Sequence, residues 1–150
     1  MSNYPIKRIV VHASATKPDM DVRAADIDRW HKDRGWNGIG YHHVITRDGL
    51  IEQGRPHETI GAHVLGWNTH SIAVCMAGGI NDDGVPEENY TPIQYEALRD
   101  LLDILTKRMY PGAMICGHRD LSPDKDGDGV IEEHEWLKAC PCFDVGKWYK

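Results

Sequence analysis

The residues best suited to do chemistry lie close together near the end of the chain, between Gly117 and Cys142. The two ends of this segment carry His118 and Cys140, whose imidazole and thiol groups are ligands that zinc prefers. Its middle is rich in carboxylates, which bind hard cations such as calcium through oxygen. The segment therefore predicts two different metal sites in series, and other parts of the chain must position them.

The carboxylate-rich middle has the spacing of an EF-hand calcium loop, from Asp124 to Glu135. Gly129 stands where such a loop makes its sharp turn. The expected calcium ligands are Asp124, Asp126, Asp128, Val130 through its carbonyl, Glu132 through a water, and Glu135. Pro123 leaves no room for an entering helix, so we expect a structural clip, inserted at about residues 121–136, and not a calcium sensor. An acidic loop without a bound ion is the alternative.

A catalytic zinc site needs three protein ligands and a fourth position for water. His12 follows the β-branched run from Ile6 to Val11, which is typical of a central strand. His118 follows a second, shorter apolar run. Both histidines would then stand at carboxyl ends of strands, where ligands gather in α/β sheets. His12, His118 and Cys140 are therefore the candidate zinc ligands.

The remaining elements follow from periodicity and turn signals. An amphipathic helix is predicted from a cap at Asp21 to near Gly35, and a longer one from Thr91 and Pro92 to Met109. Further predicted elements are a hairpin formed by residues 40–45 and 50–53, a strand at residues 71–77, a short helix at residues 132–137, and a last helical turn capped by Asp144.

Length and composition fit one domain. The chain has 150 residues, 41% of them apolar, which is enough for a single buried core. We therefore expect an α/β fold in a single domain, residues 1–150, with a central mixed β-sheet covered by helices and the calcium-loop insert near the C-terminus. The net charge of -6 argues against nucleic acid or an anionic membrane as the main partner. We expect a monomer.

The residues before His12 contain only a short apolar run, so a signal peptide is not expected. No later segment approaches the ~20 apolar residues of a membrane span, and we expect synthesis in the cytoplasm. In that compartment the four cysteines should be reduced. Cys75 and Cys116 lie in apolar runs and are expected in the core. Cys142 is expected to be a bystander, with zinc binding or a disulfide as alternatives.

Stretches spread along the chain carry a family resemblance: VVHASATKP (10–18), RGWNGIGYHHVITRDG (34–49), GAHVLGWNTHSIAVCMAGG (61–79) and KACPCFD (138–144). In this order they resemble the zinc-dependent N-acetylmuramoyl-L-alanine amidases of the phage lysozyme type, relatives of peptidoglycan recognition proteins. The resemblance implies that His12, His118 and Cys140 bind zinc. It also implies that zinc-activated water cleaves the amide between the lactyl group of N-acetylmuramic acid and L-alanine.

The resemblance assigns roles to further residues. Tyr41 and Lys138 match the catalytic tyrosine and lysine, which would hydrogen-bond the water and stabilise the oxyanion of the tetrahedral intermediate. His63, Trp67 and Asn68 match positions near the substrate groove. Plain packing or solvent exposure is the alternative for Tyr41, Lys138 and Trp67.

The motif around Tyr41 departs from the usual pattern of these enzymes, Trp-x-Asp-x-Gly-Tyr-His-Phe, at Gly38 and His43. The departures affect the packing around Tyr41 more than the chemistry. No role is assigned to the other histidines, which are His31, His42, His43, His57, His70 and His134.

The expected function is that of a phage-type endolysin, with bacterial peptidoglycan as partner, zinc as catalytic cofactor and calcium as structural cofactor. The enzyme would reach the cell wall after a membrane lesion of the kind that a holin makes. A cytosolic muropeptide-recycling amidase and a non-catalytic peptidoglycan-binding protein are the alternatives. Binding alone is disfavoured because such relatives tend to lose the ligand that Cys140 provides.

Overall fold

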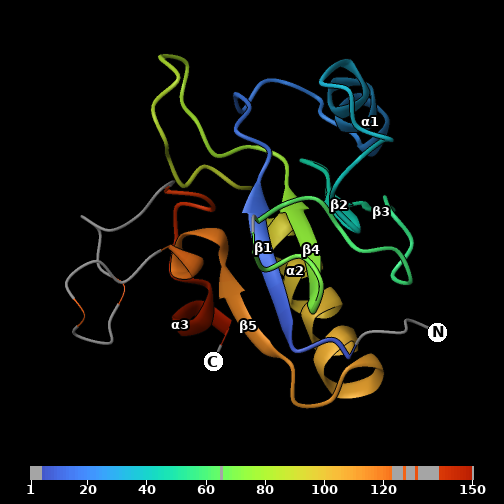
Figure 1. Ribbon diagram of the computed structural model, residues 1–150. Helices are drawn as coiled ribbons and strands as arrows, with labels where there is room; N and C mark the ends of the chain where they lie inside the picture. The colour runs from blue at the N-terminus through green and yellow to red at the C-terminus, as the bar shows by residue number, and fades with distance from the viewer. Residues whose placement is uncertain (1–4, 65, 123–126, 128–130, 132–138, 150) are drawn as a thin grey trace.

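A computed structural model describes residues 5–64, 66–122, 127, 131 and 139–149 of the chain. These residues form one domain around a five-stranded sheet with the strand order β3-β2-β4-β1-β5 (Figure 1). Neighbouring strands are parallel except for the antiparallel pair β2 and β3, so the predicted mixed sheet is confirmed. The strands are β1 (Arg8–Ala13), β2 (His43–Ile45), β3 (Ile51–Gln53), β4 (Ser71–Met76) and β5 (Met114–Gly117).

The two central strands, β1 and β4, are buried on both faces. Every residue of β4 is buried, as is every residue of β1 after Arg8, which explains why both read as continuous apolar runs. Side chains alternate between the two faces of a strand. Ile9 and Val11 therefore pack into the core cluster below one face, and His12 points to the other.

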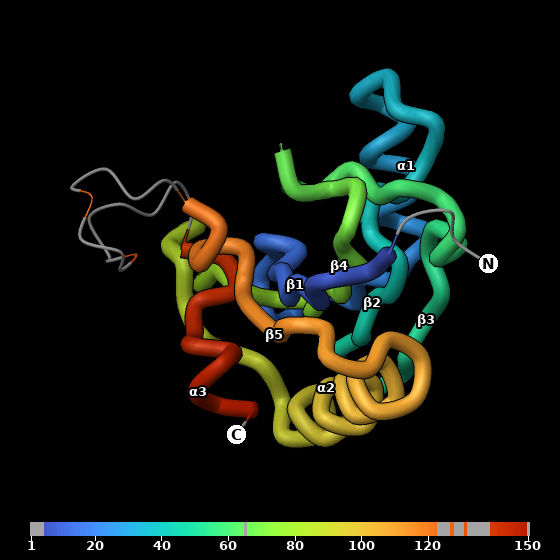
Figure 2. The backbone as a smooth tube through the Cα atoms, turned by 60° about the horizontal axis from the view of Figure 1, so that its bottom comes forward, coloured from blue at the N-terminus to red at the C-terminus, as the bar shows by residue number. Residues whose placement is uncertain are grey.

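Helices α1 (Ala24–Asp33) and α2 (Pro92–Ile104) cover opposite faces of this sheet (Figure 2). Helix α2 begins as predicted: the hydroxyl of Thr91 accepts a hydrogen bond from the Gln94 N–H at 3.2 Å, and Gln94 Oε1 accepts from the Thr91 N–H at 2.9 Å. The predicted helix to Met109 is divided, since its last turn is a π-helical turn, η1 (Leu105–Met109).

The predicted cap of α1 at Asp21 is wrong. The N-cap is Arg23, whose backbone N–H donates to the Asp26 carboxylate at 2.9 Å, while Asp21 pairs with the Arg23 guanidinium at 3.1 Å. A carboxylate inside the first turn thus replaces the cap that the sequence pattern suggested. The predicted end near Gly35 is confirmed, because Gly35 has a φ of 89° and donates to the Lys32 carbonyl.

The C-terminal part contains the 3-10 helix η2 (His118–Leu121) and helix α3 (Val145–Tyr149). Asp144 caps α3 as predicted, since its Oδ1 accepts from the Lys147 N–H at 3.1 Å. Several sequence-based predictions lie outside the described residues: the calcium ligands Asp124, Asp126, Asp128, Val130, Glu132 and Glu135, the helix at residues 132–137, and Lys138. Within the described part, no helix is long and apolar enough to cross a membrane.

Candidate active site

Two neighbouring strand ends bring His12 and His118 together. Strands β1 and β5 run parallel, with Val11 opposite Gly117. His12 is the next residue along β1, and His118 is the next residue after β5. Their ring centroids are therefore only 4.7 Å apart.

Cys140 joins the two histidines from the C-terminal segment. The Ala13 N–H donates to Cys140 Sγ at 2.9 Å, and the Arg119 N–H donates to the Cys140 carbonyl at 2.8 Å. The possible ligand atoms of His12, His118 and Cys140 all lie within 4.8 Å of one another. An N–H directed at the sulfur favours the thiolate, which is the form that binds a metal.

The surroundings of His12 also fit a metal ligand. His12 Nε2 lies 2.9 Å from His63 Nδ1. A neutral imidazole carries its proton on one nitrogen and a lone pair on the other. If His12 Nε2 donates to His63, the lone pair is on Nδ1, and the ring is oriented by an outer partner as metal-bound histidines usually are. The donor set of two imidazoles and a thiolate is one that suits zinc.

His63 itself is an incompletely satisfied group. Among the described residues, none hydrogen-bonds its Nε2, which is buried. Burial lowers the pKa of His63 to about 3, so the ring is neutral, and with Nδ1 accepting from His12 its Nε2 carries the proton. A buried donor without an acceptor costs about 1–3 kcal/mol, which a substrate oxygen would offset. His63 lines a pocket of about 220 Å³ together with two of the candidate ligands, His118 and Cys140.

Tyr41 lines the same pocket, with its ring centroid 5.1 Å from that of His12. Burial raises the pKa of Tyr41 well above its ordinary value, so the phenol keeps its proton and is a hydrogen-bond donor at neutral pH. Gly40 allows the loop that carries His63 to approach, since a Cβ at this position would lie 2.1 Å from the Ala62 carbonyl oxygen.

Trp67 and Asn68 are not among the described residues that line this pocket. The Arg8 guanidinium lies 4.4 Å from the centroid of the Trp67 ring. Arg8 precedes His12 by four residues, or about 13 Å along β1. Asn68 Oδ1 accepts from the His63 N–H at 2.9 Å and so holds the loop that carries this histidine. Direct contact of Trp67 or Asn68 with substrate stays a prediction.

One wall of the pocket was missed by the sequence analysis. It comes from α1 and the residues after it, namely Trp30, His31, Arg34 and Trp36. His31 Nδ1 accepts from the Gly40 N–H at 2.9 Å, and its ring centroid is 4.5 Å from that of Trp36. The only signal in the sequence was the four-residue spacing of Trp30 and Arg34, which places both on one helix face. This wall adds aromatic faces and a cation to the pocket.

A zinc ion held by His12, His118 and Cys140 should be bound at least about tenfold less tightly after His63→Ala, because outer partners of metal-bound histidines typically contribute 10- to 100-fold to metal affinity. Competition with a zinc chelator would measure the change. His70→Ala is the control, since His70 Nδ1 contacts the Pro5 carbonyl at the other end of β1. Zinc retention by His63→Ala equal to that of the parent would contradict the assigned orientation of His12.

Comparison with known proteins gives consistent matches over almost the whole chain. The family model described as N-acetylmuramoyl-L-alanine amidase matches residues 2–140. The endolysin of Klebsiella phage KP32 is 44% identical over 143 residues, which is 95% of this chain and 85% of that protein. The endolysin of Escherichia phage T7 is 42% identical, with coverage of 95% and 84%. The structure of the N-acetylmuramoyl-L-alanine amidase LysC from Clostridium intestinale URNW is similar, with a TM-score of 0.70, 29% identity and coverage of 93% and 78%.

Proposed function

The chain belongs to the N-acetylmuramoyl-L-alanine amidase family, and we propose that it is a zinc-dependent peptidoglycan hydrolase of the phage endolysin type. The bond cleaved is the amide between the lactyl group of N-acetylmuramic acid and L-alanine. The convergence of His12, His118 and Cys140 within 4.8 Å carries the proposal. A complete ligand set favours catalysis over binding alone, and the similarity to endolysins favours the cell wall over small recycled muropeptides.

The triad would hold a zinc ion, which supplies a Lewis acid and a nucleophilic water at neutral pH. The chain's own groups prepare this site. The Ala13 N–H stabilises the Cys140 thiolate, and His63 orients His12. Holding these side chains in place before substrate arrives removes reorganisation from the reaction.

The other groups of the pocket bind and orient the substrate. Tyr41 would donate its phenolic proton in a hydrogen bond to the water or to the substrate carbonyl oxygen. His63 Nε2–H would donate to a further substrate oxygen, and the faces of Trp30 and Trp36 would pack against sugar or peptide. Lys138, outside the described residues, takes the oxyanion-stabilising role that the family resemblance implies.

Digestion of purified sacculi tests the proposed function. The enzyme should release peptides with a free L-alanine amino group and leave glycan strands that carry lactyl carboxylates, both identified by liquid chromatography with mass spectrometry. New reducing sugar ends would show that a glycosidic bond is cut and would contradict the proposal. Turnover confined to small muropeptides, with intact sacculi unchanged, would favour the recycling alternative.

We further propose that residues 124–135 bind calcium as a structural clip, on the basis of their complete match to the loop pattern. Adding a calcium-selective chelator to the zinc-loaded protein should lower the Tm by about 5 °C, since a ligand that binds only the folded state stabilises it. Glu135→Gln should abolish this response, and Glu133→Gln, at a position that is no ligand, should keep it. If the chelator changed neither the Tm nor the activity, calcium would not act as a structural clip.

Bacterial peptidoglycan is the macromolecular partner that the family membership supports. We propose that the enzyme acts on it as a monomer. Release to the wall through a holin-type lesion also stays a prediction from the endolysin resemblance.

A further inference from the structure

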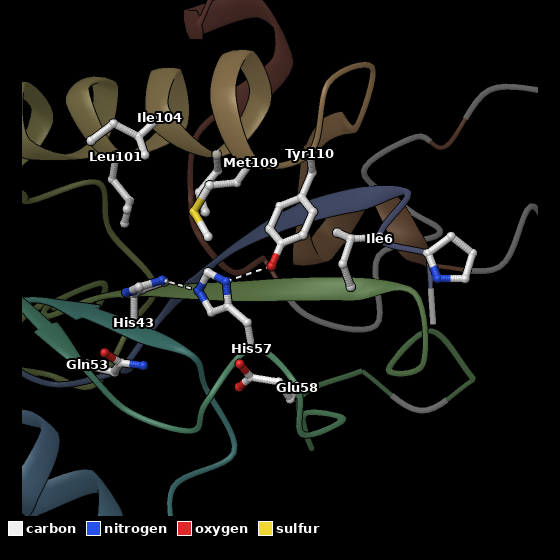
Figure 3. Close-up of a pocket in the computed structure, with 11 residues that line it drawn as sticks. Ile6, His43, Gln53, His57, Glu58, Leu101, Ile104, Met109 and Tyr110 are labelled. Carbon is white, nitrogen blue, oxygen red and sulfur yellow. Dashed lines mark hydrogen bonds between the residues drawn. The ribbon is translucent and has the colours of Figure 1, made fainter. Parts of the chain in front are cut away.

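His43 is the position at which the motif around Tyr41 has histidine in place of the usual phenylalanine, and its side chain points away from the candidate active site. Along β2, Ile45 packs into the core cluster on the α2 side of the sheet, and Val44 packs with Tyr41 on the α1 side. Because side chains alternate, His43 shares the face of Ile45. It opens into a separate cavity beneath α2 (Figure 3).

This cavity has a volume of about 730 Å³ and combines an apolar wall with one polar corner. Leu101, Ile104 and Met109 form the wall from α2 and η1. The corner consists of His43 from β2 and His57 from the loop after β3, and Figure 3 shows His57 lying between His43 and Tyr110.

The polar corner is a continuous hydrogen-bonded chain. His57 Nδ1 lies 2.7 Å from the Tyr110 hydroxyl oxygen, and His57 Nε2 lies 2.6 Å from His43 Nε2. The two imidazole planes are nearly perpendicular, at 88°, with their centroids 4.8 Å apart. Two facing ring nitrogens at this distance share a single proton. Two nitrogen lone-pair directions therefore converge on one point at the edge of a cavity.

Both histidines are held in the form that binds metals. Burial lowers the pKa of His43 to about 4 and also lowers the pKa of His57. Near neutral pH both imidazole rings are uncharged, so protons do not compete strongly with a metal ion for their lone pairs.

We propose that His43 and His57 form a second metal site, for a divalent transition-metal ion such as Zn²⁺ or Ni²⁺, on the opposite face of the sheet from the catalytic triad. Imidazole is a preferred ligand of both ions. The ion takes the place of the shared proton, which moves from Nε2 to Nδ1 of His43, so that both rings stay neutral. His57 keeps its own proton on Nδ1.

The required movement is small. Metal–nitrogen bonds of 2.0–2.1 Å in a tetrahedral arrangement hold two nitrogens roughly 3.3 Å apart. The His43 and His57 nitrogens therefore need to separate by about 0.7 Å and their rings to tilt toward the cavity. The cavity has room for this tilt and for water ligands. Among the described residues, only His12, His118 and Cys140 bring three possible ligand atoms within 4.8 Å of one another, so water completes the ligand set at His43 and His57.

Tyr110 is the outer partner of this site. A metal-bound histidine usually donates its second N–H to an oxygen, and the Tyr110 hydroxyl is placed to accept from His57 Nδ1. The π-helical turn η1 sets this position, since the Tyr110 N–H donates to the Leu105 carbonyl at 2.8 Å. Such turns occur frequently at functional sites. A bound ion would join β2, the loop after β3 and the end of α2.

Titration with Ni²⁺ of calcium-saturated protein that carries a single Zn²⁺ per chain tests the proposal without any substitution. On the proposed function, that zinc ion occupies the triad, calcium occupies residues 124–135, and the pair of His43 and His57 is left for Ni²⁺. Equilibrium dialysis with elemental analysis should find one Ni²⁺ per chain. In NMR spectra of the histidine rings, small amounts of paramagnetic Ni²⁺ should broaden the signals of His43 and His57 before those of the other histidines.

Three variants sharpen the test. His43→Phe should lose Ni²⁺ binding and keep sacculus hydrolysis. Tyr110→Phe keeps both ligands but removes the outer hydroxyl, so its Ni²⁺ Kd should rise about tenfold. His70→Gln is the matched control, with unchanged binding.

The proposal is wrong if the zinc-loaded protein takes up no Ni²⁺, or if His43→Phe binds Ni²⁺ with the Kd of the parent. It is also wrong if other histidine signals broaden first, or if binding disappears in His70→Gln. The titration of the parent protein needs no variant, so the proposal can still be tested if His43→Phe folds poorly. Loss of hydrolytic function would leave the Ni²⁺ result unaffected, so the two proposals fail separately.

Discussion

Cys140→Ala is expected to lower kcat/KM on intact sacculi at least about a thousandfold while the chain stays folded. The thiolate is one of the three ligands proposed for zinc, and its loss leaves only His12 and His118. Without a firmly held metal, the reaction loses electrostatic stabilisation of about 4 kcal/mol, which corresponds to about three orders of magnitude in rate. Cys140 packs at the margin of the core, so the expected loss is mainly chemical.

Cys142→Ala is the matched control for this experiment. Cys142 is a second thiol two residues away, and its Sγ contacts the Gly79 carbonyl at 3.4 Å instead of the histidines. The variant should keep both zinc and activity. Elemental analysis and hydrolysis, measured on both variants, separate the two cysteines. Full activity of Cys140→Ala, or equal loss in both variants, would overturn the proposed triad.

The positions of His12 and His118 could be predicted because they depend on strong local signals. Each follows an apolar run, and neighbouring parallel strands place their carboxyl ends at one edge of the sheet. Cys140 has no such signal. Its assignment came from residue type and family resemblance, and the tertiary contacts with Ala13 and Arg119 show how it reaches the histidines.

Other features depend on contacts that no local pattern contains. The pocket wall with Trp30 and Trp36 forms where the chain turns back after α1, so that His31 Nδ1 accepts from the N–H of Gly40, nine residues later. The π-helical turn η1 has the same apolar spacing as the helix before it, so periodicity predicts one continuous helix. Predicting the contact between His43 and His57 requires knowing which face of the sheet His43 occupies and where the loop after β3 runs.

His42 makes the fold sensitive to acid. Its side chain is 1% exposed, its Nδ1 accepts from the Ala73 N–H at 3.0 Å, and its Nε2 lies 2.9 Å from the Thr59 carbonyl. The ring is therefore neutral, with its proton on Nε2. Burial lowers the pKa of His42 from 6.5 to about 4. Protonation of His42 Nδ1 would turn this acceptor into a donor that faces the Ala73 N–H, so this hydrogen bond would be lost.

The free energy of unfolding should fall as the pH drops from 6.5 to 4, and His42 should account for about 3 kcal/mol of the loss. In this range the unfolded chain binds a proton at His42 that the folded chain does not, so acid favours unfolding. The stabilisation is complete above pH 6.5, the unfolded pKa, and is lost progressively down to the folded pKa near 4. Urea unfolding of metal-free protein at a series of pH values measures this slope.

His42→Asn should be less stable than the parent at pH 7.5. Its free energy of unfolding should fall by about 3 kcal/mol less than that of the parent between pH 6.5 and 4. The asparagine oxygen can still accept from the Ala73 N–H, and it does not titrate. Groups that do not interact with position 42, such as His31, cancel in the difference. His43 does not cancel fully, because the charge of His42 contributes to its lowered pKa. His70→Asn should keep the slope of the parent. Parallel pH profiles for His42→Asn and the parent would show that His42 is not the buried neutral group that makes this fold acid-sensitive.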